Sequence, residues 1–135
     1  MYTAPMYLDV LAAVRYLRKS GAKTVSVMGG SFGGSAAADA SIASQLGEID
    51  RLILLAADGS GPAERIKSPL LVIVARDDAS GDGPQLPHIR AWFDKAPDPK
   101  QLIILEGSAH GQFLFQTGQA DCVMKEILSF LTAKN

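Results

Sequence analysis

Apolar residues recur at helical spacing in three stretches of the chain, which predicts three amphipathic helices. In the first helix the apolar positions are Leu8, Leu11, Ala12, Val14 and Leu17. Gly21 follows them, at the kind of position where a glycine commonly ends a helix. The other two amphipathic helices are expected over Leu86–Lys95 and Asp121–Lys134.

Four shorter stretches are almost continuously apolar and predict β-strands over Lys23–Met28, Leu52–Ala57, Leu70–Ala75 and Leu102–Leu105. Such runs are typical of parallel strands that are buried on both faces. A helix rich in Ala and Ser is expected over Phe32–Gln45, between the first two strands. The alternation of strands and helices therefore indicates an α/β fold, with about four parallel strands and helices on both faces of the sheet.

Length and composition narrow the class of protein. The 135 residues fit a single domain over 1–135, and the apolar content of 47% with a net charge of -1 fits an ordinary soluble protein. Because the chain is not basic, we do not expect it to bind nucleic acid. No apolar run approaches the roughly 20 residues of a membrane helix, so no membrane association is expected. The N-terminus lacks a signal-peptide pattern, which predicts a cytoplasmic protein.

The stretch around Ser31 carries the strongest indication of chemistry. Gly29-x-Ser31-x-Gly33 follows one predicted strand and precedes a predicted helix, which is the context of a nucleophile elbow. Such a sharp turn is expected to leave no room for a Cβ two residues to either side of the serine, and to strain the serine backbone. The backbone N–H of Phe32 would be one donor of an oxyanion hole. The spacing fits neither a P-loop nor a dinucleotide-binding motif.

A serine nucleophile needs a base and a group that orients the base. The chain has two histidines. His110 follows the last predicted strand among small residues and is the favoured base, whereas His88 is expected to be a partly exposed helix residue. The carboxyl ends of parallel strands meet at one edge of a sheet, the edge at which such sheets place ligands.

Three aspartates follow predicted strands and can be considered as the orienting acid. Asp77 and Asp78 end the third strand, and Asp58 ends the second and ranks behind them. A carboxylate at this edge could accept the imidazole N–H and stabilise the imidazolium. The chain order Ser, Asp, His is the one associated with a nucleophile elbow.

The remaining candidate residues have simpler interpretations. Asp77, Asp78 and Asp82 do not match the spacing of a calcium loop, so we expect no metal and no cofactor. Cys122 is the only cysteine and has no histidine near it in the sequence to act as a catalytic base. It is expected to be packed within its helix, and Trp92 and Phe93 are expected to belong to the core.

These motifs together resemble the C-terminal half of an α/β-hydrolase. The resemblance runs from about Tyr7 to the end of the chain and rests on the elbow "GGSFGG", the acid loop "VARDD" and the histidine loop "EGSAHG". Aligning the acid loop places the family's aspartate on Asp78, with Ala75 where the family often has glycine, and leaves Asp77 possible. The resemblance implies a reduced α/β-hydrolase core and an esterase-like serine hydrolase, with Ser31 as nucleophile, His110 as base and Asp78 as orienting acid.

The chain departs from the family in what precedes the elbow. Family members carry earlier strands and a loop that gives a second oxyanion N–H, and nothing upstream of Ser31 here matches that loop. The strand Lys23–Met28 would then be an exposed apolar edge, which invites pairing with another chain. We therefore expect a homo-oligomer, formed through this strand or the first helix.

The expected function is hydrolysis of small, short-acyl carboxylic esters through an acyl-enzyme. The link between the second and third strands, "DGSGPAERIKSP", has room for only one or two helical turns, so no large lid is expected. The alternative is a catalytically weak or inactive hydrolase-like binding module that lacks the N-terminal oxyanion lobe.

Overall fold

The fold comes from a computed structural model, which describes residues 5–134. Four strands form the main sheet: β1 (Ser26–Gly30), β2 (Arg51–Leu55), β3 (Leu70–Ala75) and β6 (Lys100–Leu105). The α-helices are α1 (Tyr7–Lys19), α2 (Phe32–Ala43), α3 (Leu86–Lys95) and α4 (Ala120–Thr132). Shorter elements are the 3₁₀ turns η1 (Ala63–Arg65) and η2 (Gly111–Gln116) and the two-residue strands β4 (Ala79–Ser80) and β5 (Gly83–Pro84).

The main sheet is parallel throughout and has the strand order β1-β2-β3-β6. The predicted fold class, α/β with four parallel strands between helices, is confirmed. Every residue of β3 is buried, because this strand lies between β2 and β6 and is covered on both faces. This burial explains why its sequence is a continuous apolar run rather than an alternating one.

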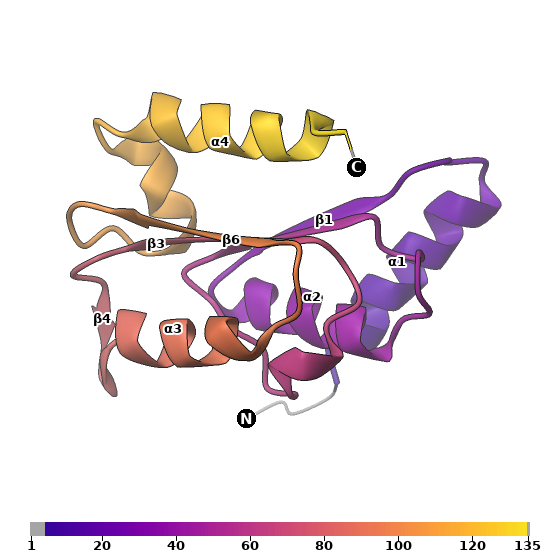
Figure 1. The fold of residues 1–135 in the computed structure, drawn as a ribbon, viewed down its shortest axis with the longest axis horizontal. Helices are drawn as coiled ribbons and strands as arrows, with labels where there is room; N and C mark the ends of the chain where they lie inside the picture. Colours follow the sequence, from indigo (N-terminus) through magenta and orange to yellow (C-terminus); the bar gives the residue numbers. More distant parts are fainter. Residues whose placement is uncertain (1–4, 135) are drawn as a thin grey trace.

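Helices cover both faces of the sheet, as Figure 1 shows, with α4 on one face and α2 and α3 on the other. Successive side chains along each strand point to opposite faces of the sheet, so each face has its own core cluster. On one face, Leu52 and Leu54 pack in a cluster with Ala37 of α2 and Ile89 of α3. On the other face, the core cluster contains Ile53, Leu55, Leu71, Ile73, Val123 and Ile127, the last two from α4.

Most differences from the sequence-based boundaries are small. β1 begins at Ser26 rather than Lys23 and continues through Gly30, so the first glycine pair belongs to the strand. The link between β2 and β3 holds only the single turn η1, as its length predicts. The β4–β5 hairpin and η2 were not predicted, because each is too short to show a hydrophobic period.

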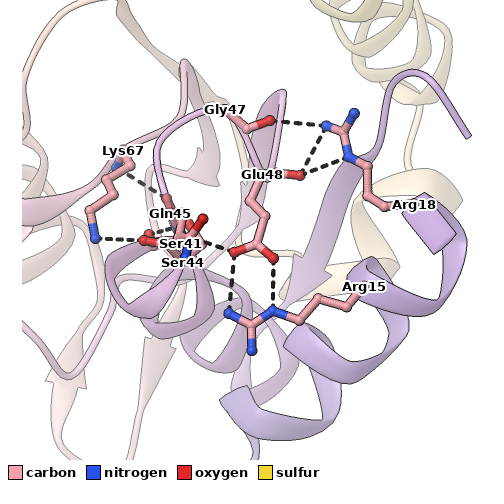
Figure 2. Close-up of polar contacts among 8 residues, drawn as sticks. All are labelled: Arg15, Arg18, Ser41, Ser44, Gln45, Gly47, Glu48 and Lys67. Carbon is pink, nitrogen blue, oxygen red and sulfur yellow. Dashed lines mark hydrogen bonds and ion pairs between the residues drawn. The ribbon is translucent and has the colours of Figure 1, made fainter.

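Arginines of α1 hold the loop between α2 and β2, as Figure 2 shows. Arg15 binds both carboxylate oxygens of Glu48, at 2.7 and 3.2 Å, and the backbone N–H of Gln45 donates to the same carboxylate at 2.9 Å. Arg18 donates to the backbone oxygens of Gly47 and Glu48, each at 3.0 Å. Hydrogen bonding to Arg15 keeps the pKa of Glu48 below its usual 4.5, and the same contact raises the pKa of Arg15.

Lys67 binds the C-terminal end of α2 (Figure 2). Its ammonium donates to the carbonyls of Ile42 and Ser44, each at 2.6 Å, and its backbone N–H donates to the hydroxyl of Ser41 at 3.2 Å. A cation at this end of a helix offsets the partial negative charge of its last carbonyls. Lys67 therefore ties the end of α2 to the segment that leads into β3.

β1 forms one edge of the sheet and pairs only with β2 among the described strands. Met28, at its centre, is 52% exposed. The apolar edge expected from the sequence is therefore present. Among residues 5–134, no helix is long and apolar enough to cross a membrane.

Candidate active site

Ser31 lies at a sharp turn between β1 and α2. Its backbone has φ 52° and ψ -121°, a conformation that non-glycine residues adopt at a cost of about 1–3 kcal/mol. Its N–H donates to the Leu55 carbonyl at 2.9 Å, and its own carbonyl accepts from the Ser35 N–H at 3.1 Å. Hydrogen bonds of both its N–H and its carbonyl therefore hold Ser31 in this strained conformation, which the elbow motif predicts.

Two glycines permit this turn, and only one of them was correctly assigned from the motif. A Cβ on Gly29 would lie 2.5 Å from the Gly33 carbonyl oxygen, so Gly29 is required. A Cβ on Gly33 would meet nothing within 4 Å, and the prediction that crowding excludes a side chain there is wrong. The crowding falls instead on Gly34, where a Cβ would lie 2.5 Å from the Ala57 Cβ because the segment after β2 passes beside the first turn of α2.

His110 reaches Ser31 from the loop that follows β6. Its Nε2 lies 2.7 Å from Ser31 Oγ, so the hydroxyl can donate to the imidazole. Gly111, with φ 58°, lets the chain turn directly after the histidine and pass close to Ser31. The imidazole is 40% exposed, and it therefore lies at an open surface rather than in a closed cavity.

Asp78 binds the other ring nitrogen of His110. Its Oδ2 lies 2.7 Å from His110 Nδ1, and the carboxylate is only 2% exposed. The turn after β3 fixes it, since the Asp78 N–H donates to Ala75 and its carbonyl accepts from Gln85 at 2.9 Å. Asp77, one residue earlier, is exposed, and its N–H donates to Gly107. Within residues 5–134, Asp78 is the carboxylate that binds His110.

Asp58, the third candidate acid, pairs with the other histidine. Its Oδ2 lies 3.1 Å from His88 Nδ1, and His88 Nε2 lies 2.9 Å from the amide oxygen of Gln85. His88 is exposed on α3, as expected, but its pairing with Asp58 was missed. The two residues are 30 positions apart, and no local pattern indicates that α3 brings them together.

Phe32 is the first residue of α2, and its side chain is 66% exposed. The N–H groups of a helix's first turn have no acceptor within the helix, so they can bind an anion outside it. Phe32 N–H follows Ser31 directly and is therefore one candidate donor to an oxyanion formed on an acyl group at Ser31 Oγ.

Cys122 and the acidic loop add no further chemistry to this site. Cys122 is exposed, so the expectation that it is packed is wrong: Val123 and Ile127 carry the buried face of α4 instead. No group of three or more potential metal ligands occurs among residues 5–134.

The arrangement is a continuous chain of hydrogen bonds from a hydroxyl through an imidazole to a buried carboxylate. An imidazole held in this way can take a proton from the hydroxyl, while the carboxylate fixes its orientation and stabilises the resulting positive charge. All three groups follow the carboxyl ends of strands or the turn next to one, which is where open parallel sheets bind ligands.

Comparison with known proteins supports the fold. A solved structure described as a predicted CIB-like hydrolase from Thermoplasma acidophilum superposes with a TM-score of 0.69 at 17% sequence identity. The match covers 92% of this chain and 59% of that one, so the chain spans about three fifths of the length of this neighbour. No protein-family model and no curated protein matches. The chain therefore shares the α/β fold of this structure over most of its own length.

Proposed function

We propose that the protein is a serine hydrolase that cleaves small, short-acyl carboxylic esters through an acyl-enzyme. The observation that carries the proposal is the hydrogen-bonded chain Ser31–His110–Asp78, with 2.7 Å at each of its two contacts. The strained backbone of Ser31 supports it, because strain of this kind gathers at functional sites. The hydrolase-like fold supports hydrolysis in general.

The proposed reaction has two halves. Ser31 Oγ attacks the ester carbonyl while His110 Nε2 takes the hydroxyl proton, and the C–O bond to the alcohol breaks as His110 returns that proton to the leaving oxygen. A water molecule then gives its proton to His110 and attacks the acyl-enzyme, which releases the carboxylic acid and restores the serine. Asp78 holds the imidazole by its Nδ1–H and stabilises the imidazolium in both halves.

The oxyanion formed in each half needs hydrogen-bond donors. Phe32 N–H is the donor that this chain offers from the start of α2. In enzymes with two such donors, the loss of one costs about 100- to 1,000-fold in rate. We therefore expect the Phe32 N–H to contribute to the rate of both halves of the reaction.

The choice of small esters follows from how the β2–β3 link packs. Gly61 of this link binds the Trp92 indole N–H at 3.1 Å and the Asp39 carboxylate at 3.0 Å, so the link lies against α2 and α3. It does not form a large lid over Ser31. An open site of this kind accepts esters of varied alcohols but binds none of them tightly. We therefore propose small esters with short acyl groups as substrates.

One experiment separates the enzyme from the alternative, a weak or inactive binding module. Hydrolysis of p-nitrophenyl acetate is measured with the purified protein and with its Ser31→Ala variant. With the unmodified protein, we expect a rate of p-nitrophenol release that saturates as the substrate concentration rises. With Ser31→Ala, we expect only the rate measured without protein. Equal rates for the two proteins would identify a module that does not use Ser31.

We also propose that the protein forms a homo-oligomer through the β1 edge. Backbone groups on the free side of an edge strand can pair with another strand, and β1 carries no charge or proline that would discourage this. Met28→Lys places a charge on the exposed face of β1, and Leu46→Lys, at an 84% exposed loop position, is the matched control. Light scattering should give an oligomer for the protein and the control and a monomer for Met28→Lys. A monomeric mass for the unmodified protein at micromolar concentration would contradict the proposal.

A further inference from the structure

Two exposed phenylalanines lie beside the contact between Ser31 and His110. Phe32 directly follows Ser31 and is 66% exposed, and Phe113 lies three residues after His110 and is 50% exposed. Neither ring belongs to the buried clusters of the core. Among residues 5–134, Tyr16 on α1 is the only other exposed aromatic residue. Single exposed apolar side chains are common on protein surfaces, but two aromatic rings next to one site indicate a surface that contacts a ligand.

The backbone brings both phenylalanines to the elbow. The start of η2 packs directly against it, since a Cβ on Gly111 would lie 3.8 Å from the Ser31 Cβ. The Phe113 N–H donates to the His110 carbonyl at 3.1 Å, so Phe113 is held in the same turn as the histidine. Phe113 therefore lies on the His110 side of the site, and Phe32 lies on the side of the oxyanion donor.

Ester cleavage at Ser31 requires the two parts of the ester to lie on different sides of the site. The carbonyl oxygen must reach the Phe32 N–H, where the oxyanion is stabilised. The oxygen of the alcohol must come within hydrogen-bond reach of His110 Nε2, because His110 returns the proton to it. The alcohol part of the ester therefore lies beside the histidine loop, which carries the Phe113 ring.

We propose that Phe113 is a specificity-determining residue that binds an aromatic ring in the alcohol part of the substrate. The preferred substrates are then short-acyl esters of phenols, such as phenyl acetate. Two aromatic rings that pack in an offset or edge-to-face arrangement gain more than the burial of their area alone provides. In the reaction, Ser31 Oγ bonds to the acyl carbon, the bond from that carbon to the phenolic oxygen breaks, and the serine proton passes through His110 to the phenolic oxygen. This inference rests on the proposed esterase activity and adds the class of alcohol to it.

Kinetics with two acetate esters test the role of Phe113. Phenyl acetate and cyclohexyl acetate carry rings of the same number of carbons, and only the first ring is aromatic. Phe113→Ala should raise KM for phenyl acetate by about 3- to 10-fold with kcat nearly unchanged, and should raise KM for cyclohexyl acetate by less. Each ester is compared between proteins, so the difference in leaving group between the two esters cancels. An equal change in KM for the two esters, or no change in either, would overturn the proposal.

Two further variants serve as controls for this comparison. Phe113→Trp keeps an aromatic ring at the position and should retain the low KM for phenyl acetate. Tyr16→Ala removes an exposed aromatic ring from α1, outside the site, and should change neither KM. A rise in KM for phenyl acetate in Tyr16→Ala as large as that in Phe113→Ala would contradict a specific role for Phe113.

A binding measurement separates this inference from the proposed activity. Phenyl acetate is titrated into ¹⁵N-labelled Ser31→Ala protein, which cannot form the acyl-enzyme, and saturable shifts are expected in the amides of Gln112 and Phe113. Adding Phe113→Ala to this protein should raise the Kd by about 3- to 10-fold. Hydrolysis that depends on Ser31 but occurs without these shifts would overturn the role of Phe113 and leave the esterase proposal intact. The shifts without any hydrolysis that depends on Ser31 would support the aromatic site and overturn the esterase proposal.

Discussion

The two histidines of this protein are each paired with an aspartate, and the comparison between the pairs shows what makes one of them a candidate active site. His110 and Asp78 lie 2.7 Å apart, with the carboxylate 2% exposed. His88 and Asp58 lie 3.1 Å apart, with the carboxylate 26% exposed. Both aspartates follow parallel strands at the same edge of the sheet, so position on the sheet alone does not distinguish them.

What distinguishes the pairs is the group on the far side of each imidazole. His110 Nε2 meets the hydroxyl of Ser31, whereas His88 Nε2 meets the amide of Gln85 one helical turn away. An amide oxygen cannot act as a nucleophile in acyl transfer at an ordinary rate, but a hydroxyl that gives its proton to an imidazole can. The His88 pair is therefore expected to position α3, and the His110 pair to carry the chemistry.

The largest expected difference is between matched histidine variants. His110→Gln removes the proposed base and should lower kcat/KM for p-nitrophenyl acetate by about 10⁴-fold or more, because the members of such a triad act as a unit. His88→Gln should leave the rate close to that of the unmodified protein. Steady-state kinetics on both purified variants check this prediction. Similar losses of kcat/KM in the two variants would contradict the distinction between the pairs.

Matched aspartate variants should separate the pairs almost as strongly. Asp78→Asn keeps the shape of the acid but loses its charge and can favour the wrong imidazole tautomer, so kcat should fall by about 10³- to 10⁴-fold. Asp58→Asn should leave kcat unchanged. The same kinetic assay applies, together with the thermal midpoint as a control for folding. A larger loss in Asp58→Asn than in Asp78→Asn would reassign the acid.

A smaller loss of kcat is expected from a variant that displaces Ser31 but keeps all the reacting groups. Gly34→Ala forces a Cβ against Ala57 and should displace the elbow, with a loss of about 100-fold in kcat. Gly33→Ala places its Cβ in open space and should leave kcat unchanged. Its free energy of unfolding should rise by up to about 1 kcal/mol, because alanine is more favourable than glycine within a helix. Urea unfolding and kinetics on both variants test this; equal rate losses would show that the turn is not sterically fixed at Gly34.

The smallest effect is expected at a charged pair that has no part in the site, Arg15 and Glu48. The pKa of Glu48 is lowered in the folded protein, so its contribution to stability is present above the usual value of 4.5 and is lost as the pH falls through the folded pKa. Glu48→Gln should lower the thermal midpoint slightly at pH 7 and not at all at strongly acidic pH, with kcat unchanged. A stability difference that grows as the pH falls would contradict this sign.

The sequence predicted the parallel α/β core and the pairing of Ser31 with His110. Continuous apolar runs marked the buried strands, and the ends of those strands placed Ser31 and His110 at one edge of the sheet. It favoured Asp78 over Asp77 only through the family resemblance, because the turn after β3 decides which of two adjacent carboxylates faces inward.

Other features depended on packing between distant elements and left no local signal. The pair of His88 and Asp58 forms only once α3 is docked on the sheet. The need for Gly34 rather than Gly33 arises from Ala57, which belongs to the segment after the neighbouring strand. The exposure of Cys122 depends on which side of α4 faces β3.

The most direct test of the central claim is covalent labelling of Ser31. The protein is treated with a fluorophosphonate, which reacts with activated serine hydroxyls, and the labelled residue is identified by peptide mass spectrometry. We expect a single adduct on Ser31, formed far more slowly in His110→Gln and at an unchanged rate in His88→Gln. No adduct on Ser31, or equal labelling in the two histidine variants, would contradict the proposal that His110 activates this serine.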